Sequence, residues 1–595
     1  MPDTRTIQGW LAAFGAALAE RDIFTATVLF EPAGYWRDLL AFTWNIKTME
    51  GREAIGAMLA ETLAATAPRA WRVAGETVAE GDDLSAWITF ETATATGTGR
   101  ITLRNGLCHT LLTAISDLRG HEEPRGATRP KGIEHRADRA RRTWTEARAA
   151  EAARLGHEDQ PYALIVGGGQ GGIALGARLR QLGVPALIVE KNPRAGDSWR
   201  NRYRSLVLHD PVWYDHMPYL PFPENWPVFT PKDKMGDWLE AYAQMFELNI
   251  WTSTTCDSAV WDAGRGEWAV QVTRDGVPAT LRPRQLVFAT GAYGPPRAID
   301  WPGAERFGGT LIHSSAYRDG RDFKGKSCVV VGSASSAHDV CVDLWEAGAE
   351  VTMIQRSPTI VVRSETLMEL GFDSYSEAAL ARGITTEIAD MLGAATPFGL
   401  FAEGQKALYR TIRARDAAFY ERLAAAGFAL DFGDDETGLM MRALRTASGY
   451  YIDVGASDLI ARGEIKVLSG AGVAEVTEHG LRLTDGRSVA AEVIVACTGY
   501  QSMNETVAGI VSREAADAVG PCWGLGSGVR GDPGPWQGEL RNMWKPTAIE
   551  ALWFHGGNLA LSRFYSRFVA LQLKARMEGI ATPVYGRPAP LPSGL

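Results

Sequence analysis

The segment Tyr162-Ala-Leu-Ile-Val-Gly-Gly-Gly-Gln-Gly-Gly-Ile constrains the fold of this chain more than any other stretch. An apolar run leads into Gly167, Gly169 and Gly172, which fit the spacing G-x-G-x-x-G. In such a loop the first glycine makes the tight turn, the second admits a pyrophosphate and the third lets helix and strand pack closely. The next apolar run ends at Glu190, about twenty residues further on, where a carboxylate suits ribose hydroxyls. We therefore predict a dinucleotide site here; the alternative is a glycine turn that serves packing alone.

A second segment, Val329-Val-Val-Gly-Ser-Ala-Ser-Ser-Ala-His-Asp-Val340, has the same layout but keeps only Gly332 of the three glycines. Ala334 and Ala337 occupy the other two positions. The following strand-like run ends in Arg356, and an arginine at this position accommodates a 2′-phosphate. We predict an NADPH site with a loosened hold on the pyrophosphate at Ala334; the alternative is a strand, turn and helix without a ligand. The candidate contacts are Gly332, Ser333, Ala334, Ser335, Ser336, Arg356 and Ser357.

The composition narrows the class of protein. With 595 residues, 46% hydrophobic and 22% charged, the chain can build several ordinary soluble domains. A net charge of -9 gives no basic footprint, so we expect no nucleic acid partner. Neither a membrane-spanning apolar run nor a secretion signal is evident, which predicts a cytoplasmic protein without an integral membrane segment. None of the six cysteines forms a C-x-x-C pair, which argues against a disulfide framework and a metal site.

Four further motifs point to one family. They are Gly196-Asp-Ser-Trp199, Leu286-Val-Phe-Ala-Thr-Gly-Ala292, Phe307-Gly-Gly-Thr-Leu-Ile-His-Ser-Ser-Ala-Tyr317, which fits F-x-G-x-x-x-H-x-x-x-(W/Y/F/P), and Cys497-Thr-Gly-Tyr500. Together with the two loops, this set resembles the flavin-containing monooxygenase family and its Baeyer–Villiger relatives over about residues 160 to 580. The segments Leu552–Leu559 and Ser562–Ser566 resemble bacterial type II members, which carry an N-terminal nuclear-transport-factor-2-like domain.

The resemblance implies two cofactors and a reaction. FAD would bind the first loop and NADPH the second, and O2 would be activated as a C4a-(hydro)peroxyflavin. The expected activity is Baeyer–Villiger oxidation of small ketones; S- or N-oxygenation of a sulfide or amine, and an H2O2-forming NADPH oxidase, stay open. A disulfide reductase would need a cysteine pair, and a non-enzymatic flavin-bound protein is the remaining alternative. The implied FAD contacts are Gly167, Gly169, Gly172, Glu190, Lys191, Trp199, Arg200, Thr290, Gly291, Thr498 and Gly499.

The segment Leu206-Val-Leu-His-Asp-Pro211 supplies the catalytic candidates. By resemblance, His209 stands where many family members carry an asparagine near the flavin. A histidine can donate a hydrogen bond to a peroxide and change its charge near neutral pH. We predict His209 as the peroxyflavin-stabilising group and Asp210 as a second catalytic group, against a buried structural histidine. His313 of the eleven-residue motif either couples nucleotide binding to domain movement or hydrogen-bonds within the fold, and we favour the second role.

The expected fold class is α/β, with two dinucleotide-binding (Rossmann-like) domains preceded by a small α+β cone-like domain. In the first domain we expect two helices followed by a curved antiparallel sheet, acting as a binding or assembly module. A homodimer is left open. The expected ranges are 1–117 for the α+β domain, 118–160 for a charged linker and helix, 161–325 for the first part of the FAD domain, 326–490 for the NADPH domain with a helical insertion at 365–448, and 491–595 for the second FAD part and tail.

Overall fold

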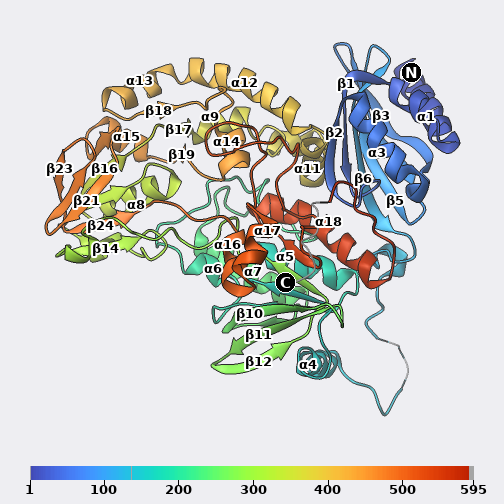
Figure 1. Cartoon of the computed structure of the whole chain (residues 1–595), viewed down its shortest axis with the longest axis horizontal. Helices are drawn as coiled ribbons and strands as arrows, with labels where there is room; N and C mark the ends of the chain where they lie inside the picture. The colour runs from blue at the N-terminus through green and yellow to red at the C-terminus, as the bar shows by residue number, and fades with distance from the viewer. Residues whose placement is uncertain (1, 134, 136, 588–595) are drawn as a thin grey trace.

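The computed structural model describes residues 2–133, 135 and 137–587. Its N-terminal domain is a six-stranded sheet with three helices, at the right of Figure 1. Long alternating strands such as Ala95–Arg104 bury every second side chain, which gives the sheet one apolar face. The elements are α1 (Pro2–Glu20), α2 (Ile23–Val28), β1 (Phe30–Leu39), β2 (Ile46–Glu50), α3 (Gly51–Thr66), β3 (Arg69–Glu80), β4 (Asp83–Glu91), β5 (Ala95–Arg104) and β6 (Leu107–Leu118).

Two expectations for this domain were wrong. Strands β1 and β2 lie between the second and third helices, so the helices do not all precede the sheet. The sheet order is β2-β1-β6-β5-β4-β3, and β1 pairs with β6 in parallel, so the sheet is mixed rather than antiparallel. The segment around Trp36 lacks the apolar–polar alternation of a half-buried strand, because β1 is buried on both faces near its end.

The charged segment that follows contains one exposed helix, α4 (Trp144–Arg154). Thr143 and Glu146 form a reciprocal capping box at its start: the Thr143 hydroxyl accepts from the Glu146 amide, and the Glu146 carboxylate accepts from the Thr143 amide. This agrees with a linker that carries a solvated helix.

The first nucleotide domain is a five-stranded parallel sheet of order β25-β13-β7-β8-β9. The strand β7 ends at the first glycine loop, and helix α5 follows it. Helix α18 lies against α5 in the centre of Figure 1, and the antiparallel β10–β12 sheet hangs below. The elements are β7 (Ala163–Val166), α5 (Gln170–Gln181), β8 (Ala186–Val189), α6 (Asp197–Arg200), α7 (Lys232–Met245), β9 (Ile250–Trp251), β10 (Thr254–Asp262), β11 (Glu267–Arg274), β12 (Val277–Leu281), β13 (Gln285–Phe288), α16 (Asn504–Ile510), α17 (Arg513–Val519), β25 (Leu552–Phe554) and α18 (Leu559–Met577).

The second nucleotide domain, at the left of Figure 1, has a five-stranded parallel sheet of order β14-β24-β15-β16-β20. Its members β14 and β24 lie outside the expected range 326–490, so that boundary was too narrow at both ends. The chain crosses into the second domain near Pro296 and returns near Tyr500, where these two residues form an antiparallel bridge. The elements are β14 (Thr310–His313), β15 (Ser327–Val331), α8 (Ser335–Glu346), β16 (Glu350–Gln355), β17 (Thr359–Arg363), β18 (Leu430–Asp431), β19 (Tyr450–Asp453), α15 (Ala456–Ala461), β20 (Ile465–Ser469), β21 (Val473–Thr477), β22 (Gly480–Leu483), β23 (Ser488–Ala490) and β24 (Val493–Ala496).

A run of helices within this domain links it to the N-terminal domain. In Figure 1, α13 and α12 run along the top of the molecule from the second nucleotide domain toward β2. These helices contact the N-terminal domain: the Arg37 guanidinium of β1 donates to the Ala394 carbonyl and lies 5.0 Å from the centre of the Phe398 ring. The helices are α9 (Ser364–Leu370), α10 (Glu377–Ala381), α11 (Thr386–Ala394), α12 (Phe398–Arg415), α13 (Ala417–Ala425) and α14 (Gly438–Thr446).

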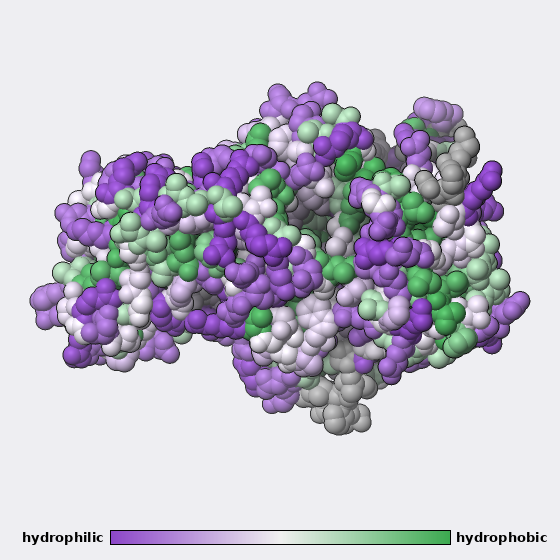
Figure 2. Space-filling view, turned by 90° about the horizontal axis from the view of Figure 1, so that it is seen from above, coloured by the Kyte–Doolittle hydropathy of each residue, from purple (hydrophilic) through white to green (hydrophobic). Residues whose placement is uncertain are grey.

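The surface is mixed in character. On the face shown in Figure 2, apolar side chains form small areas interrupted by hydrophilic ones. Among the described residues, none of the helices is both long and apolar enough to cross a bilayer.

Candidate functional site

The first glycine loop has the close approaches that its motif predicts. Gly167 has a φ of +112°, and a Cβ at this position would lie 2.5 Å from the Ala289 carbonyl oxygen. A Cβ on Gly172 would lie 1.9 Å from the Gly167 carbonyl oxygen, which would force α5 away from the loop. Gly169 is the N-cap of α5 and offers no side-chain cap, so the first amides of the helix stay available to an anion.

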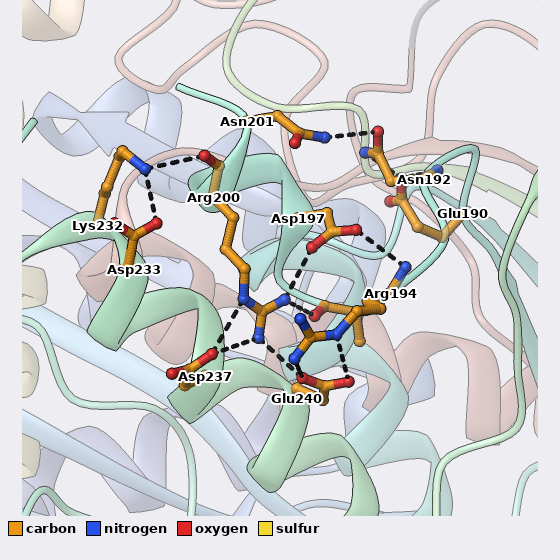
Figure 3. Close-up of polar contacts among 11 residues, drawn as sticks. Glu190, Asn192, Arg194, Asp197, Arg200, Asn201, Lys232, Asp233, Asp237 and Glu240 are labelled. Atoms are coloured by element: carbon orange, nitrogen blue, oxygen red, sulfur yellow. Dashed lines mark hydrogen bonds and ion pairs between the residues drawn. The ribbon is translucent and has the colours of Figure 1, made fainter. Parts of the chain in front are cut away.

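Glu190 at the end of β8 closes one side of this loop. Its side chain is buried and accepts hydrogen bonds from the Gly168 amide at 2.7 Å and the Asn192 amide at 2.8 Å. The Asn192 side chain adds a third bond at 2.6 Å, seen at the upper right of Figure 3. Lys191 next to it is exposed. The carboxylate is thus held at the edge of the loop, where a ribose would lie.

Arg200 is engaged by the protein itself. Its guanidinium donates to Asp197 at 2.9 Å, Asp237 at 2.8 Å and Glu240 at 2.8 Å, the network in the centre of Figure 3. These bonds join α6 to α7, which favours a structural role for Arg200; its cofactor role stays a prediction. The preceding residue, Trp199, instead contacts the first glycine loop through Gln170.

The Trp199 indole contacts the start of α5. Its Nε1 donates to the Gln170 side chain at 3.2 Å, and the Gln170 amide donates to the Gly557 carbonyl at 3.0 Å. The glycine loop, the Trp199 segment and the turn before α18 therefore form one hydrogen-bonded cradle.

The second loop repeats the backbone of the first. Gly332 has a φ of +134°, and a Cβ there would lie 2.5 Å from the Cys497 carbonyl oxygen. Ala334 is the N-cap of α8 with φ −92° and ψ −174°, close to the −81° and −170° of Gly169. The alanine therefore adopts an ordinary extended conformation without backbone strain. Its methyl group is the only difference from glycine at this position.

The serines of the second loop differ in what they contact. The Ser333 hydroxyl bonds the Thr359 hydroxyl at 2.7 Å, and the Ser335 hydroxyl donates to the Tyr450 carbonyl at 2.9 Å. Ser336 is half-buried at the start of α8, and Arg356 at the end of β16 is exposed. These polar groups surround the amide end of the helix.

The two crossing segments lie between the loops. Gly291 has a φ of +111° and Gly499 a φ of +83°, both suited to glycine. Thr290 is exposed, whereas the Thr498 hydroxyl is buried and has no hydrogen-bond partner among the described residues. His313 Nε2 bonds the Gly499 carbonyl at 3.1 Å, and burial lowers the pKa of its imidazole. A neutral His313 that ties β14 to the crossing segment supports the structural role.

The remaining residues of the eleven-residue motif also serve packing. A Cβ on Gly309 would lie 2.1 Å from the Glu492 carbonyl oxygen, so β14 and β24 need glycine there. The buried Tyr317 hydroxyl donates to Asp343 of α8 at 2.7 Å.

His209 and Asp210 lie side by side at the N-terminal end of α18. His209 is partly exposed, and its Nε2 is 3.9 Å from the Asp210 carboxylate. Burial raises the pKa of Asp210, while the charge of His209 opposes this rise. Asn558 donates to Asp210 at 3.5 Å and to the Tyr214 hydroxyl at 3.2 Å, and it also caps α18.

A second buried carboxyl group follows in the same segment. Asp215 is 1% exposed, and neither of its oxygens has a hydrogen-bond partner among the described residues. Burial and the charge of Asp210 raise its pKa well above the usual value. Arg563 of α18 lies nearby, donating to the Tyr214 and His216 carbonyls and pairing with Asp390 at 2.7 Å.

The structure carries no ligand, but the cradles fit dinucleotides. Each loop has a glycine where an added Cβ would collide with backbone, and a helix amide end without a side-chain cap. At the end of the next strand lies Glu190 for the first loop, which suits ribose hydroxyls, and Arg356 for the second, which suits a phosphate.

Comparisons with known proteins agree with this geometry. The family model described as pyridine nucleotide-disulphide oxidoreductase matches residues 164–432. Indole-3-pyruvate monooxygenase YUCCA1 of Oryza sativa subsp. japonica is 34% identical over 345 residues, which cover 58% of this chain and 77% of that protein. The probable indole-3-pyruvate monooxygenase YUCCA10 of Arabidopsis thaliana is 30% identical, over 57% of this chain and 81% of the relative. The chain belongs to the flavin-containing monooxygenase family.

Solved structures match this flavin-dependent monooxygenase in fold. Cyclohexanone monooxygenase in its loose, ε-caprolactone-bound conformation has a TM-score of 0.50 and 18% identity, covering 70% of this chain and 88% of the other. The OTEMO complex with FAD and NADP also has a TM-score of 0.50 and 18% identity, covering 71% and 85%. Although the matching family model is named for disulfide chemistry, all six cysteines of this monooxygenase are free.

Sequence reasoning missed several residues of this candidate site. Asn558 had a recognisable signal, because an asparagine directly before an apolar helical run is a typical N-cap. Asp215 and Arg563 had none, since the burial of Asp215 and the pairing of Arg563 with Asp390 depend on packing between distant segments. His555 lies fully buried beside Gly171, and burial lowers its pKa to about 3, so its imidazole is neutral.

Proposed function

We propose that this monooxygenase binds FAD at the first loop and NADPH at the second, and oxygenates carbonyl compounds by Baeyer–Villiger oxidation. When bound, FAD supplies the redox chemistry, accepting hydride from NADPH and activating O2. The observation that carries the proposal is the His209–Asp210 pair at the amide end of α18, where Asn558 bonds Asp210 and the adjacent Gly557 accepts a bond from Gln170 of the first loop. A hydrogen-bond donor and an acid in one place suit the handling of a reduced oxygen species and a carbonyl group.

The residues of the chain have separable tasks in this proposal. His209 donates a hydrogen bond toward the reacting oxygen, and Asp210 holds a proton to a higher pH than a free aspartate because burial raises its pKa. Asn558 fixes the Asp210 carboxyl group and the Tyr214 hydroxyl relative to α18. The Tyr214 ring packs against Phe372 at 5.1 Å and Tyr375 at 4.8 Å, which keeps water from this side.

The substrate class has a second candidate, a ketone that carries a carboxylate. The relatives are named for indole-3-pyruvate, which is a 2-oxo acid. Arg202 is exposed, and its guanidinium makes no ion pair with the part of the chain that the structure describes. It lies 5.9 Å from the centre of the Tyr203 ring. The Tyr203 hydroxyl donates to Asp339, and the charge of His209 opposes the rise that burial causes in the pKa of Asp339. The charge of Arg202 acts on Asp339 as well, so Arg202 and His209 lie near the same carboxylate, and an exposed guanidinium there suits a substrate carboxylate.

The activity test measures NADPH use, H2O2 and oxygenated product for an uncharged ketone, an aromatic 2-oxo acid, a sulfide and an amine. We expect ester from the ketone, or the acid one carbon shorter from the 2-oxo acid. Arg202→Ala should raise KM for the 2-oxo acid about 10-fold or more, the value of a charge-assisted hydrogen bond, and leave KM for the ketone unchanged. H2O2 equal to NADPH with every substrate would instead establish an oxidase. Oxygenation of only the sulfide or amine would favour heteroatom chemistry.

The role of His209 is tested by coupling efficiency. His209→Ala should raise the H2O2 released per NADPH by several-fold, because the site loses the hydrogen-bond donor that His209 would offer to the reacting oxygen. His209→Asn should restore part of the coupling, since an amide also donates. His135→Ala, at an exposed position in the linker, is the matched control and should behave as the parent. An unchanged ratio in His209→Ala would remove His209 from the mechanism.

We also propose that the N-terminal domain is nuclear-transport-factor-2-like, as in type II members, and acts as an assembly module. Three helices against a mixed sheet support this fold. The interior of the domain is filled by aromatic rings, with centroid distances of 4.6 Å for Trp10–Phe14, 4.8 Å for Trp36–Phe42 and 4.7 Å for Trp71–Phe90. Rings that fill the interior leave little room for a substrate there.

A further inference from the structure

Arg356 at the end of β16 is an uncompensated cation. It is exposed, and it makes neither a hydrogen bond nor an ion pair with any described residue. A Cβ at Gly472 would lie 3.2 Å from the Arg356 Cδ, so the arginine stem lies directly over this glycine. The packing fixes the stem while the guanidinium stays free for a ligand.

A second arginine reaches the same place from a distant segment. Arg530 lies between α17 and β25, in the chain that returns to the first nucleotide domain. Its Nη2 donates to the Ser357 hydroxyl at 3.2 Å, and its amide donates to the Asp434 carboxylate at 3.0 Å. Arg530 is exposed, and no carboxylate of the described chain pairs with its guanidinium. Arg530 therefore brings a guanidinium without a carboxylate partner to the residue that directly follows Arg356.

The segment that carries Arg530 is firmly built. The Asp532 carboxylate is fully buried and accepts hydrogen bonds from the amides of Leu525, Gly526 and Ser527. Arg541 pairs with the same carboxylate at 2.8 Å. This bonding holds the turn around Arg530 in place before any ligand arrives, so the second arginine is preorganised.

We propose that Arg530, together with Arg356 and Ser357, binds the 2′-phosphate of NADPH. A phosphomonoester carries close to two negative charges and three acceptor oxygens, which match two guanidinium forks and a hydroxyl. This inference rests on the proposed binding of a dinucleotide at the second loop. Because Arg530 belongs to the returning segment, the phosphate ties the second nucleotide domain to that segment. NADH lacks the phosphate and cannot make this link.

The test uses the FAD-loaded full chain and calorimetric titration with adenosine 2′,5′-bisphosphate and 5′-AMP, which differ only in the 2′-phosphate. We expect the parent to bind the bisphosphate at least about 10-fold more tightly. Arg530→Ala should lose about 10-fold of that preference and leave 5′-AMP binding unchanged. Arg530→Lys should keep part of it, since a lysine retains the charge without the fork. Arg72→Ala, exposed on the N-terminal domain, is the control.

The outcomes separate this inference from the proposed function. If Arg530→Ala keeps the full preference while Arg356→Ala loses it, Arg530 has no part in the site and NADPH binding stands. If the parent binds neither nucleotide, the dinucleotide site at the second loop fails, and the role of Arg530 fails with it. Flavin content and the unfolding midpoint of each variant show whether it has folded. A folded Arg530→Lys variant decides the question if Arg530→Ala does not fold.

Discussion

At the scale of single residues, the third position of the two loops gives a sharp contrast. Gly172→Ala would place its Cβ 1.9 Å from the Gly167 carbonyl oxygen, whereas Ala337 at the equivalent position of the second loop is buried without difficulty. We expect Gly172→Ala to lose most bound FAD and to cost about 1–3 kcal/mol of stability, as overpacking does. Flavin absorbance per protein and thermal unfolding measure both effects.

The matched control for that substitution is Gly169→Ala. Its Cβ would meet only the Ser198 hydroxyl, at 3.3 Å, so FAD content should fall far less. Equal losses in the two variants would show that any methyl group in the loop excludes the cofactor, and that the helix contact at Gly172 is not the cause.

A second residue-scale prediction concerns Asp215, whose carboxyl pKa is raised well above the usual 3.8 by burial and by Asp210. The folded protein keeps this proton where the unfolded chain has lost it. Stability therefore falls as pH rises from about 4 toward the folded-state pKa, by at most about 1.4 kcal/mol per pH unit. Asp215→Asn should abolish this contribution and gain stability over the parent as pH rises. The unfolding midpoints of the parent and of Asp215→Asn at about pH 5 and about pH 8 measure this effect. A difference between the two proteins that is the same at both pH values would contradict the prediction.

At the scale of an element, the start of helix α8 is suboptimal. Ala334 is its N-cap and makes no side-chain cap, and alanine is much less favourable there than glycine. Ala334→Gly should therefore leave stability unchanged or raise it by about 0.5 kcal/mol. Removing the methyl group from the pyrophosphate path should also lower the Kd for NADP+ severalfold. Thermal unfolding tests the stability, and titration of the same sample tests the Kd for NADP+. A higher Kd in Ala334→Gly would show that the methyl group contacts the cofactor favourably.

Elements also show where sequence reasoning reaches its limit. The two loops, the acidic and basic strand ends and the helices of 365–448 carry local patterns, and the structure forms them. The strand β24 has an equally clear apolar pattern, yet the sequence prediction placed it in the second FAD part, because its pairing with β14 and β15 is a long-range choice. The meeting of Arg530 with Ser357, or of Arg563 with Asp390, depends on the same long-range packing. Residue type and spacing alone do not encode such contacts locally.

At the scale of the whole molecule, one buried ion pair attaches the N-terminal domain. Arg37 and Glu539 are each 2% exposed and are bonded at 2.6 and 2.8 Å, and the Tyr565 hydroxyl accepts a further bond from Arg37 at 3.0 Å. Arg37→Met leaves Glu539 buried with only the Thr48 hydroxyl at 2.7 Å and no paired cation, which should cost about 3–5 kcal/mol. The double variant Arg37→Met with Glu539→Met should recover much of this loss, because it removes the unpaired charge. Thermal unfolding of these two variants, of Glu539→Met and of the parent measures the coupling.

The control is the pair Arg69–Glu91 on the same domain, which is 48% and 42% exposed and should contribute at most about 1 kcal/mol. The attachment has a consequence for the candidate active site, because α11 carries both the Ala394 carbonyl bonded to Arg37 and the Asp390 carboxylate bonded to Arg563. Arg563 in turn holds the carbonyls of Tyr214 and His216, close to Asp210 and Asp215. Arg37→Met should therefore also raise the H2O2 released per NADPH. A lower unfolding midpoint with unchanged coupling would limit the N-terminal domain to stability alone.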